Sequence, residues 1–318
     1  MPSLTRAQVV ELSGVPLEDA VRLWALLGFA HVEDDEVVFA QADVDALRGA
    51  QELVELGILS AERQAALVRT WGRSFARLAD WQTSLLATVA LESGADLDES
   101  TAALASEVVP RVDALQSYVW RRHLVSAGAR RLANADPAAG APLSAAPLSV
   151  GFVDIVGYTS RSKSLDEDEL VAWIETFENE TTALVVARGG RIIKNIGDEV
   201  LYVADDARAA LDVALELCRR GSDPADPFPE VRAGLAHGET VRRLGDVYGE
   251  TVNIAARLTS VARPGSVLVD RGAYEALNEG VGDDDAEVHH PDFHFRRLRR
   301  LSVKGYSRLA AWAVRPRE

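Results

Sequence analysis

The segment from Arg191 to Val203 constrains the fold of this chain more than any other stretch. It reads RIIKNIGDEVLYV, two short β-branched and apolar runs on either side of Gly197. This pattern is the signal for a tight β-hairpin. Lys194 and Asp198 are expected at its tip, so a cation and a carboxylate are held a few residues apart on a rigid element.

A second carboxylate follows another predicted strand. Residues 152–159, FVDIVGYT, form an apolar run that carries Asp154 and ends in a Gly turn. Backbone N–H groups in such a turn can face a phosphate. Two aspartates at strand ends could together hold two metal ions.

The bulk properties are those of an ordinary soluble protein. At 318 residues, with 47% hydrophobic and 26% charged, the chain is long enough for two domains. No apolar run approaches about 18 residues and the N-terminus lacks signal-peptide features, so we expect no transmembrane segment and a cytoplasmic protein. The single cysteine, Cys218, fits a reducing compartment and is expected to be a buried thiol.

The net charge of −15 limits the classes of partner. Phosphate backbones are bound by positive surfaces, so we expect no nucleic-acid partner. A nucleoside triphosphate is compatible with this charge, because paired aspartates bind its metal ions and not its phosphates.

Residues 1–134 are predicted to form an all-α domain. Two short helices between Thr5 and Leu27, an acidic turn within 32–39 and a helix from about 42 to 57 resemble a winged helix-turn-helix of the MerR type. Twelve Lys and Arg against 19 Asp and Glu in residues 1–134 argue against DNA binding. A helical scaffold or regulatory module is the expectation.

Two longer helices are expected after this winged-helix-like start, at 61–91 and, after Pro110, at 112–133. The first has an apolar stripe typical of a core or a dimer face: Leu67, Trp71, Phe75, Leu78, Trp81, Leu85 and Val89. A lipid or small-molecule pocket lined by Trp71, Trp81 and Trp120 is the alternative. Residues 135–147, rich in Ala, Pro and Gly, are a predicted linker.

Strands and helices alternate in the second predicted domain, residues 148–318. Strands with helices on one face, in βαββαβ order, predict a ferredoxin-like α+β domain. The expected strands are 148–154, 190–203 as a hairpin, 230–237, 240–244, 266–269, 293–302 and 309–314, and the expected helices are 167–187, 206–220, 250–262 and 270–278.

Residues 244–258, LGDVYGETVNIAARL, form a third informative segment. Asn253 and Arg257 are four apart, so on a helix they share one face, where a neutral donor and a planar cation can converge on one oxyanion. Asp246 is expected in a short loop before that helix.

The segments FVDIVGYT, IIKNIGDEV and GDVYGETVNIAARL together resemble the catalytic domain of class III nucleotide cyclases, over about residues 148–316. The resemblance implies an adenylate cyclase that converts ATP into 3′,5′-cyclic AMP and pyrophosphate. It also implies two divalent cations, Mg²⁺ or Mn²⁺, held by Asp154, Ile155 and Asp198. One ion would lower the pKa of the ribose 3′-hydroxyl, and the other would clamp the triphosphate.

The remaining site residues also come from the resemblance. Lys194 and Asp246 would read adenine, whose N1 acceptor and 6-amino donor they complement. Guanine presents a donor where adenine has an acceptor and an acceptor where adenine has a donor. Guanylyl members of the family typically carry Glu and a small residue such as Cys at these positions. Asn253 and Arg257 would orient the ribose and stabilise the charge that builds on the α-phosphate. Lys304 would contact the triphosphate, with a plain surface lysine as the alternative.

The resemblance further implies a homodimer, because in this family the metal aspartates come from one subunit and the base-reading and transition-state residues from its partner. The first half resembles an actinobacterial regulatory domain that inhibits the cyclase and in some members responds to pH. The effector, whether a small molecule, a lipid or a proton sensed by His31 or His123, stays open.

Other functions also stay open. An inactive cyclase-like regulator that binds nucleotide would keep this fold, and a guanylate cyclase would keep most of the site. A diguanylate cyclase would need a signature that is missing here. His289, His290 and His294 fit no standard zinc spacing, and a solvated loop is the expected alternative.

Overall fold

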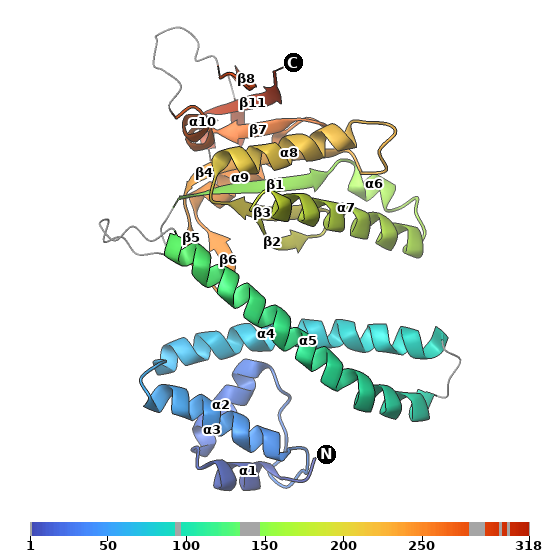
Figure 1. Cartoon of the computed structure of the whole chain (residues 1–318), viewed down its shortest axis with the longest axis vertical. Coiled ribbons are helices and arrows are strands. Elements are labelled where there is room, and N and C mark those ends of the chain that lie inside the picture. Colours follow the sequence, from blue (N-terminus) through green and yellow to red (C-terminus); the bar gives the residue numbers. More distant parts are fainter. Residues whose placement is uncertain are drawn as a thin grey trace. The chain divides into compact units, whose positions relative to one another are not determined.

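The computed structural model folds the chain into two compact units, residues 1–134 and 135–318 (Figure 1). It describes residues 2–92, 97–133, 147–279, 290–298, 301–303 and 306–317, with the backbone alone at 90, 92, 97–107, 131, 133, 301–303 and 306–308. The predicted linker up to residue 146, His289 and Lys304 lie outside the described residues. No helix in the described ranges combines the length and apolar character that crossing a bilayer requires.

The first unit is helical, as predicted. The Thr5 hydroxyl accepts the N–H of Gln8, and the Gln8 side chain accepts the N–H of Thr5, which caps the first helix. Its small core includes Val9, Trp24 and Val44. The elements are α1 (Arg6–Ser13), α2 (Leu17–Leu27), α3 (Gln41–Glu55), α4 (Ala61–Glu92) and α5 (Leu97–Ala133).

The acidic turn within residues 32–39, which would be the wing of a winged helix-turn-helix, is not flanked by two paired strands. Residues 32–38 contain only a turn at positions 34 and 35, and Phe39 pairs with the backbone of Leu4. Its ring stacks on Trp24 with the centroids 4.8 Å apart. Four consecutive acidic residues, 33–36, would repel one another in a tight hairpin, and Arg6 holds Asp34 by an ion pair.

The two long helices differ from the prediction at one boundary. Helix α5 begins before Pro110 and continues through it. A proline removes one backbone hydrogen bond, which a 37-residue helix can accommodate with a local bend. Helix α4 crosses α2 at Gly72, where a Cβ would lie 2.5 Å from the carbonyl oxygen of Leu27.

The second unit has the predicted α+β architecture. Its elements are β1 (Pro147–Ile155), α6 (Tyr158–Arg161), α7 (Glu167–Ala187), β2 (Arg191–Ile196), β3 (Glu199–Ala204), α8 (Ala207–Gly221), β4 (Val231–Glu239), β5 (Val241–Arg243), β6 (Asp246–Tyr248), α9 (Glu250–Val261), β7 (Val267–Asp270), α10 (Arg271–Leu277), β8 (Phe293–Arg297), β9 (Leu301–Val303), β10 (Tyr306–Leu309) and β11 (Ala311–Pro316).

The main sheet has the strand order β2-β3-β1-β4-β7-β11-β8. Its first four strands, with α7 and α8 as crossovers, form the ferredoxin-like βαββαβ unit that the sequence predicts. Strand β4 pairs with β7 in parallel, and the other neighbours pair antiparallel. The hairpin β5–β6 forms a small sheet of its own.

Helices cover both faces of the main sheet, not one as predicted (Figure 1). Val153 and Ile155 of β1 pack in the cluster of α7, α8 and α10, whereas Val150 and Phe152 pack in the cluster of α9. Strand β1 is therefore apolar on both sides. At Gly234 of β4 a Cβ would lie 2.4 Å from the Thr259 nitrogen of α9, so only glycine allows this close approach.

Candidate functional site

The hairpin β2–β3 turns at Gly197 and Asp198, where Gly197 takes the left-handed φ of 65°. The Asp198 carbonyl accepts the N–H of Ile155 over 3.1 Å, which holds this turn against the end of β1. Because the turn uses only two residues, Lys194 lies within β2 opposite Leu201 and not at the tip. The two charges of the predicted hairpin tip are therefore separated along the strand.

Strand register places three charged side chains side by side. Asp154 of β1 lies opposite Glu199 of β3 and opposite Arg232 of β4. Arg232 donates from Nε and Nη2 to Oδ2 of Asp154, at 2.7 and 2.6 Å, and from Nη1 to the carbonyl of Ser260 on α9, at 3.2 Å. Sequence reasoning missed Arg232, because only the register of β1 against β4 identifies its partner.

The carboxylates of this cluster are electrostatically frustrated. Burial, together with the negative charges of Asp154 and Asp198, raises the pKa of Glu199 to about 7, and the charge of Arg232 opposes only part of this rise. Burial also raises the pKa of Asp154, with Asp198 adding to the rise and the hydrogen bond from Arg232 opposing it. A nearby cation would relieve this repulsion.

The cluster fits divalent cations in its chemistry, because hard cations prefer carboxylate and carbonyl oxygens. The described part of the chain contains no group of three or more His, Cys, Asp or Glu side chains that could hold a metal ion. A site here would therefore use the carboxylates of Asp154 and Asp198 with a backbone carbonyl. The side chain of Ile155 is buried and apolar, so this residue could offer only its backbone oxygen.

Lys194 and Asp246, 52 residues apart in sequence, meet in the structure. Lys194 Nζ donates to Asp246 Oδ2 over 2.6 Å, and Oδ1 accepts the N–H of Val247 over 2.8 Å. Burial favours a raised pKa for Asp246, but these hydrogen bonds outweigh it and lower the pKa. Asp246 begins strand β6 and does not lie in the predicted loop.

Helix α9 carries Asn253 and Arg257 one turn apart, with Asn253 exposed and Arg257 partly buried. The helix begins after Gly249, whose carbonyl accepts the N–H of Asn253 over 3.3 Å. The Thr259 hydroxyl donates to the carbonyl of Phe152 over 3.3 Å and fastens the helix to β1. The two side chains therefore lie on a helix that is rigidly seated on the sheet.

The histidines give no metal site in the described ranges. His290 is buried, not in a solvated loop as expected. Its ring stacks on Phe293 with the centroids 4.8 Å apart, and its Nδ1 accepts the N–H of Asp292 over 3.1 Å. His294 lies in strand β8. These contacts give His290 a structural role.

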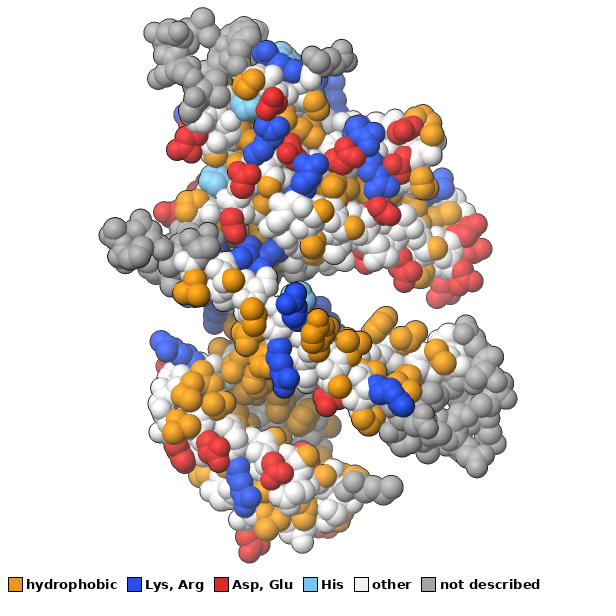
Figure 2. Space-filling view, in the orientation of Figure 1, with side chains coloured by type: hydrophobic (Ala, Val, Ile, Leu, Met, Phe, Trp, Pro, Cys, Tyr) orange, Lys and Arg blue, Asp and Glu red, His pale blue; other side chains and the backbone are white. Residues whose placement is uncertain are grey.

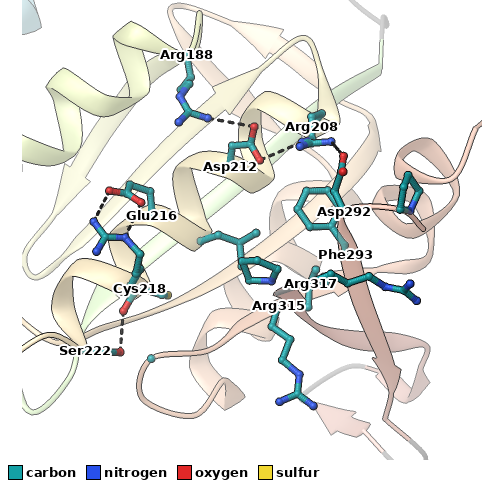
Figure 3. Close-up of a pocket in the computed structure, with 16 residues that line it drawn as sticks. Arg188, Arg208, Asp212, Glu216, Cys218, Ser222, Asp292, Phe293, Arg315 and Arg317 are labelled. Carbon is teal, nitrogen blue, oxygen red and sulfur yellow. Dashed lines mark hydrogen bonds and ion pairs between the residues drawn. The ribbon is translucent and has the colours of Figure 1, made fainter. Parts of the chain in front are cut away.

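A cavity of about 600 Å³ lies between α8 and the segment that includes β8 and β11, away from all the predicted site residues (Figure 3). Asp212 accepts from Arg188 and Arg208 at 3.1 Å each, and Arg208 also donates to Asp292 at 2.7 Å. These arginines are already paired, which leaves them little charge for a ligand.

The ferredoxin-like sheet with its added hairpin is the fold of a class III nucleotide cyclase domain. Residues 143–316 match the adenylate and guanylate cyclase catalytic domain, and the chain belongs to this family.

Three relatives extend the similarity into the first half of the chain. An adenylate cyclase of Streptomyces coelicolor is 39% identical over 86% of this chain and 71% of its own. An adenylate cyclase of Glutamicibacter nicotianae is 37% identical over 83% and 69%. A protein of Mycobacterium tuberculosis named a pH-sensitive adenylate cyclase is 34% identical over 87% and 70%.

Proposed function

We propose that this protein is an adenylate cyclase that converts ATP into 3′,5′-cyclic AMP and pyrophosphate by in-line attack of the ribose 3′-hydroxyl on the α-phosphate. The relatives named adenylate cyclase support the reaction. The observation that carries the choice of substrate is the contact between Lys194 and Asp246.

The Lys194–Asp246 pair complements adenine without being broken. The ammonium group has three donors, so one can stay on Asp246 while another donates to N1 of the base. The carboxylate has free lone pairs that can accept from the 6-amino group. Guanine would set donor against donor and acceptor against acceptor at this edge, and we therefore propose ATP as the preferred substrate.

Asp154, Asp198 and the carbonyl of Ile155 would hold two divalent cations, Mg²⁺ or Mn²⁺. The chemistry that such bound ions supply is a lower pKa of the 3′-hydroxyl and neutralisation of triphosphate charge. Asn253 would orient the ribose, and the guanidinium of Arg257 would stabilise the charge that develops on the α-phosphate. Arg232 orients Asp154 and ties it to α9.

We further propose that the site is completed by a second subunit. Apolar side chains are exposed on the hairpin β5–β6 and at the end of β2, beside the Lys194–Asp246 pair: Ile196, Val241, Leu244 and Tyr248. In the described part of one chain, no hydrogen bond or ion pair joins Asp154 or Asp198 to Lys194 or Asp246. A dimer across this face would bury the apolar residues and bring the two groups together.

The first unit would regulate the rate. This role is proposed because the M. tuberculosis relative is named pH-sensitive and the similarity includes this half. His123 lies exposed on α5, and we propose it as a candidate proton sensor.

Incubation of the purified protein with ATP or GTP, in Mg²⁺ or Mn²⁺, followed by identification of the product, tests this function. We expect cyclic AMP as the main product. Asp154→Asn and Asp198→Asn should each lower turnover by more than about 100-fold while the circular dichroism spectrum is unchanged. Nucleotide binding without any cyclic product would instead indicate an inactive regulator, and cyclic GMP as the main product would indicate a guanylate cyclase.

A further inference from the structure

The last stretch of the chain is basic, although the protein as a whole is acidic. Residues 290–318 carry eight Lys and Arg against two Asp and Glu, a balance of +6, whereas the whole chain has a net charge of −15. This stretch contains β8 and β11, and β8 ends the main sheet at the edge opposite β2 (Figure 1). It is therefore separated by the width of the sheet from Lys194.

Arginines elsewhere in the second unit are mostly paired with carboxylates. Arg208 and Arg220 each contact two carboxylates, and Figure 2 shows basic and acidic side chains intermixed over α8. Among the described residues, no ion pair joins Arg296, Arg315 or Arg317 to a carboxylate. Figure 3 shows the guanidinium groups of Arg315 and Arg317 apart from the ion pairs of α8. These cations are available to an anionic partner.

Strand register gathers these cations on one face of the sheet. His294 of β8 lies opposite Arg315 of β11, and Arg296 lies opposite Ala313. Opposite residues of antiparallel strands point to the same face, as do residues two apart along a strand. Arg317 follows Arg315 by two residues. We call these four exposed residues the basic edge: His294, Arg296, Arg315 and Arg317.

Strand β8 also has backbone groups that are open to pairing, since the described sheet ends with this strand. The N–H of Leu298 donates to the carbonyl of Ala311 on the β11 side over 2.9 Å. Because hydrogen bonding alternates along an antiparallel strand, the N–H and C=O groups of Phe295 and Arg297 point away from β11. Backbone groups of this kind form a template for a further strand.

We infer that the basic edge binds an acidic, extended segment of another protein, which adds to the sheet as a strand beside β8. Main-chain hydrogen bonds supply affinity in this mode of binding, and side chains at alternate positions supply specificity. Carboxylates at every second position of the segment meet the basic edge. The positions between them lie on the other face, beside the half-buried Phe295, so apolar residues fit there.

Other polyanions fit this surface less well. Membrane-binding surfaces add apolar side chains that enter the lipid, and among the described residues after Val261 no large apolar side chain is strongly exposed. Single-stranded nucleic acid needs aromatic rings for its bases, but Trp312 of β11 is stacked on Tyr274 with the centroids 4.4 Å apart. A long polyanion would also meet the acidic remainder of the chain. The surface takes no part in the proposed reaction, so the inference goes beyond the proposed function.

The test is the dissociation constant of the full-length protein for a fluorescein-labelled peptide of about seven residues that alternates glutamate and valine. It is measured by fluorescence anisotropy at low ionic strength. Arg296→Gln/Arg315→Gln should weaken binding at least about tenfold, because two charge-assisted hydrogen bonds are lost. The matched control, Arg219→Gln/Arg271→Gln, removes two exposed charges from α8 and α10 and should leave the constant unchanged.

A second pair of variants tests strand addition separately from charge. Arg297→Pro removes an outward N–H, and edge strands tolerate proline where the N–H faces solvent. Arg297→Gln removes the same charge and keeps the N–H. We expect the proline variant to bind the alternating peptide at least about threefold more weakly than the glutamine variant. Equal affinities in two folded variants would contradict strand addition.

A comparison of peptides on the wild-type protein does not depend on how any variant folds. A peptide of the same composition, with its glutamates and valines in separate blocks, should bind at least about threefold more weakly than the alternating one. Equal affinity for the two peptides would overturn the inference. So would binding of oligothymidylate or phosphatidylserine vesicles to the basic edge without binding of the alternating peptide, as would an equal loss of affinity in the Arg219/Arg271 control.

Discussion

The Lys194–Asp246 pair can be tested by reversing its polarity at single-residue scale. Lys194→Glu with Asp246→Cys replaces the donor with an acceptor and removes the carboxylate that would accept from the 6-amino group. We expect the ratio of kcat/KM for ATP over GTP to fall at least about tenfold, because each unpaired group at the base edge costs about 1–3 kcal/mol. Competition assays with both nucleotides measure this ratio.

The single variant Lys194→Arg is the control for that swap. It keeps the positive charge and a hydrogen-bond donor but changes the geometry of the donor group. ATP should therefore remain the preferred substrate, with a higher KM. A folded, active double variant with unaltered selectivity would remove both residues from the base pocket.

The surroundings of His237 predict that the free energy of unfolding depends on pH. Its Nδ1 lies 2.9 Å from the Ser149 hydroxyl oxygen, and its backbone N–H donates to Asp270 over 3.1 Å. Burial lowers the pKa of His237, although the charges of Asp206 and Glu279 oppose this. The folded state therefore prefers the neutral ring, and the unfolded chain takes up the proton first as pH falls below about 6.5.

We expect this stabilisation to be present above about pH 6.5 and to be lost on acidification, with a slope of at most about 1.4 kcal/mol per pH unit. His237→Gln keeps a hydrogen-bonding group but cannot titrate. Urea unfolding at pH 7 and pH 5 should show a smaller loss for this variant than for wild type. Equal losses would show that His237 does not contribute.

The hairpin β5–β6 shows strain at the scale of an element. Leu244 has a φ of 54° and Gly245 a φ of 81°, so both loop residues are left-handed. Turns of this kind favour Asn-Gly, and a leucine costs roughly 1–2 kcal/mol there. Leu244 is 44% exposed, so packing within one chain offsets only part of this cost. Burial of the side chain in a dimer contact would offset more.

Leu244→Asn should therefore have different effects on the stability of the fold and on the stability of the dimer. We expect the variant to unfold at the same or a higher temperature, because asparagine adopts a positive φ readily. Its dimer should dissociate more readily and its turnover at low protein concentration should fall. Calorimetry and activity against concentration measure the two effects. Full activity at all concentrations would contradict a dimer contact at this tip.

The shared site is a property of the whole molecule. If Asp198 acts with Arg257 of the other subunit, Asp198→Ala and Arg257→Ala homodimers should each be nearly inactive. A mixed dimer has one site with both changes and one with neither. With random exchange about half the dimers are mixed, so activity should recover to roughly a quarter of wild type.

Subunit exchange must be secured for this comparison. Co-expression with two different tags and two-step purification gives the mixed dimer directly. An Asp154→Ala/Asp198→Ala mixture is the matched control, because both changes lie in the same half-site and should not recover. A purified Asp198/Arg257 mixed dimer that stays inactive would mean that each subunit builds its own site.

Regulation by the first unit is also tested on the whole molecule. Deletion of residues 1–134 should change turnover several-fold and flatten any dependence on pH between about 5.5 and 8, where an imidazole titrates. His123→Ala in the full chain should reproduce part of that change. Identical pH profiles for full-length and truncated protein would end the sensor hypothesis.

The sequence alone determined the local elements and the family. Period-two and period-3.6 patterns predicted the hairpin at 191–203, helix α9 and the βαββαβ order, because these patterns depend on neighbours a few residues apart. The three motifs, read in order, also identified the cyclase domain. Confirmation came from the strand order and the family match.

Only the tertiary structure decided which distant residues meet. The Arg232–Asp154 pair depends on the register of β1 against β4, and the Lys194–Asp246 contact depends on where hairpin β5–β6 lies beside β2. Likewise, the position of α9 on the opposite face of the sheet depends on the close approach at Gly234. The register of neighbouring strands, and the face of the sheet that a helix covers, are set by packing between elements far apart in the chain. A local pattern in the sequence does not specify that packing.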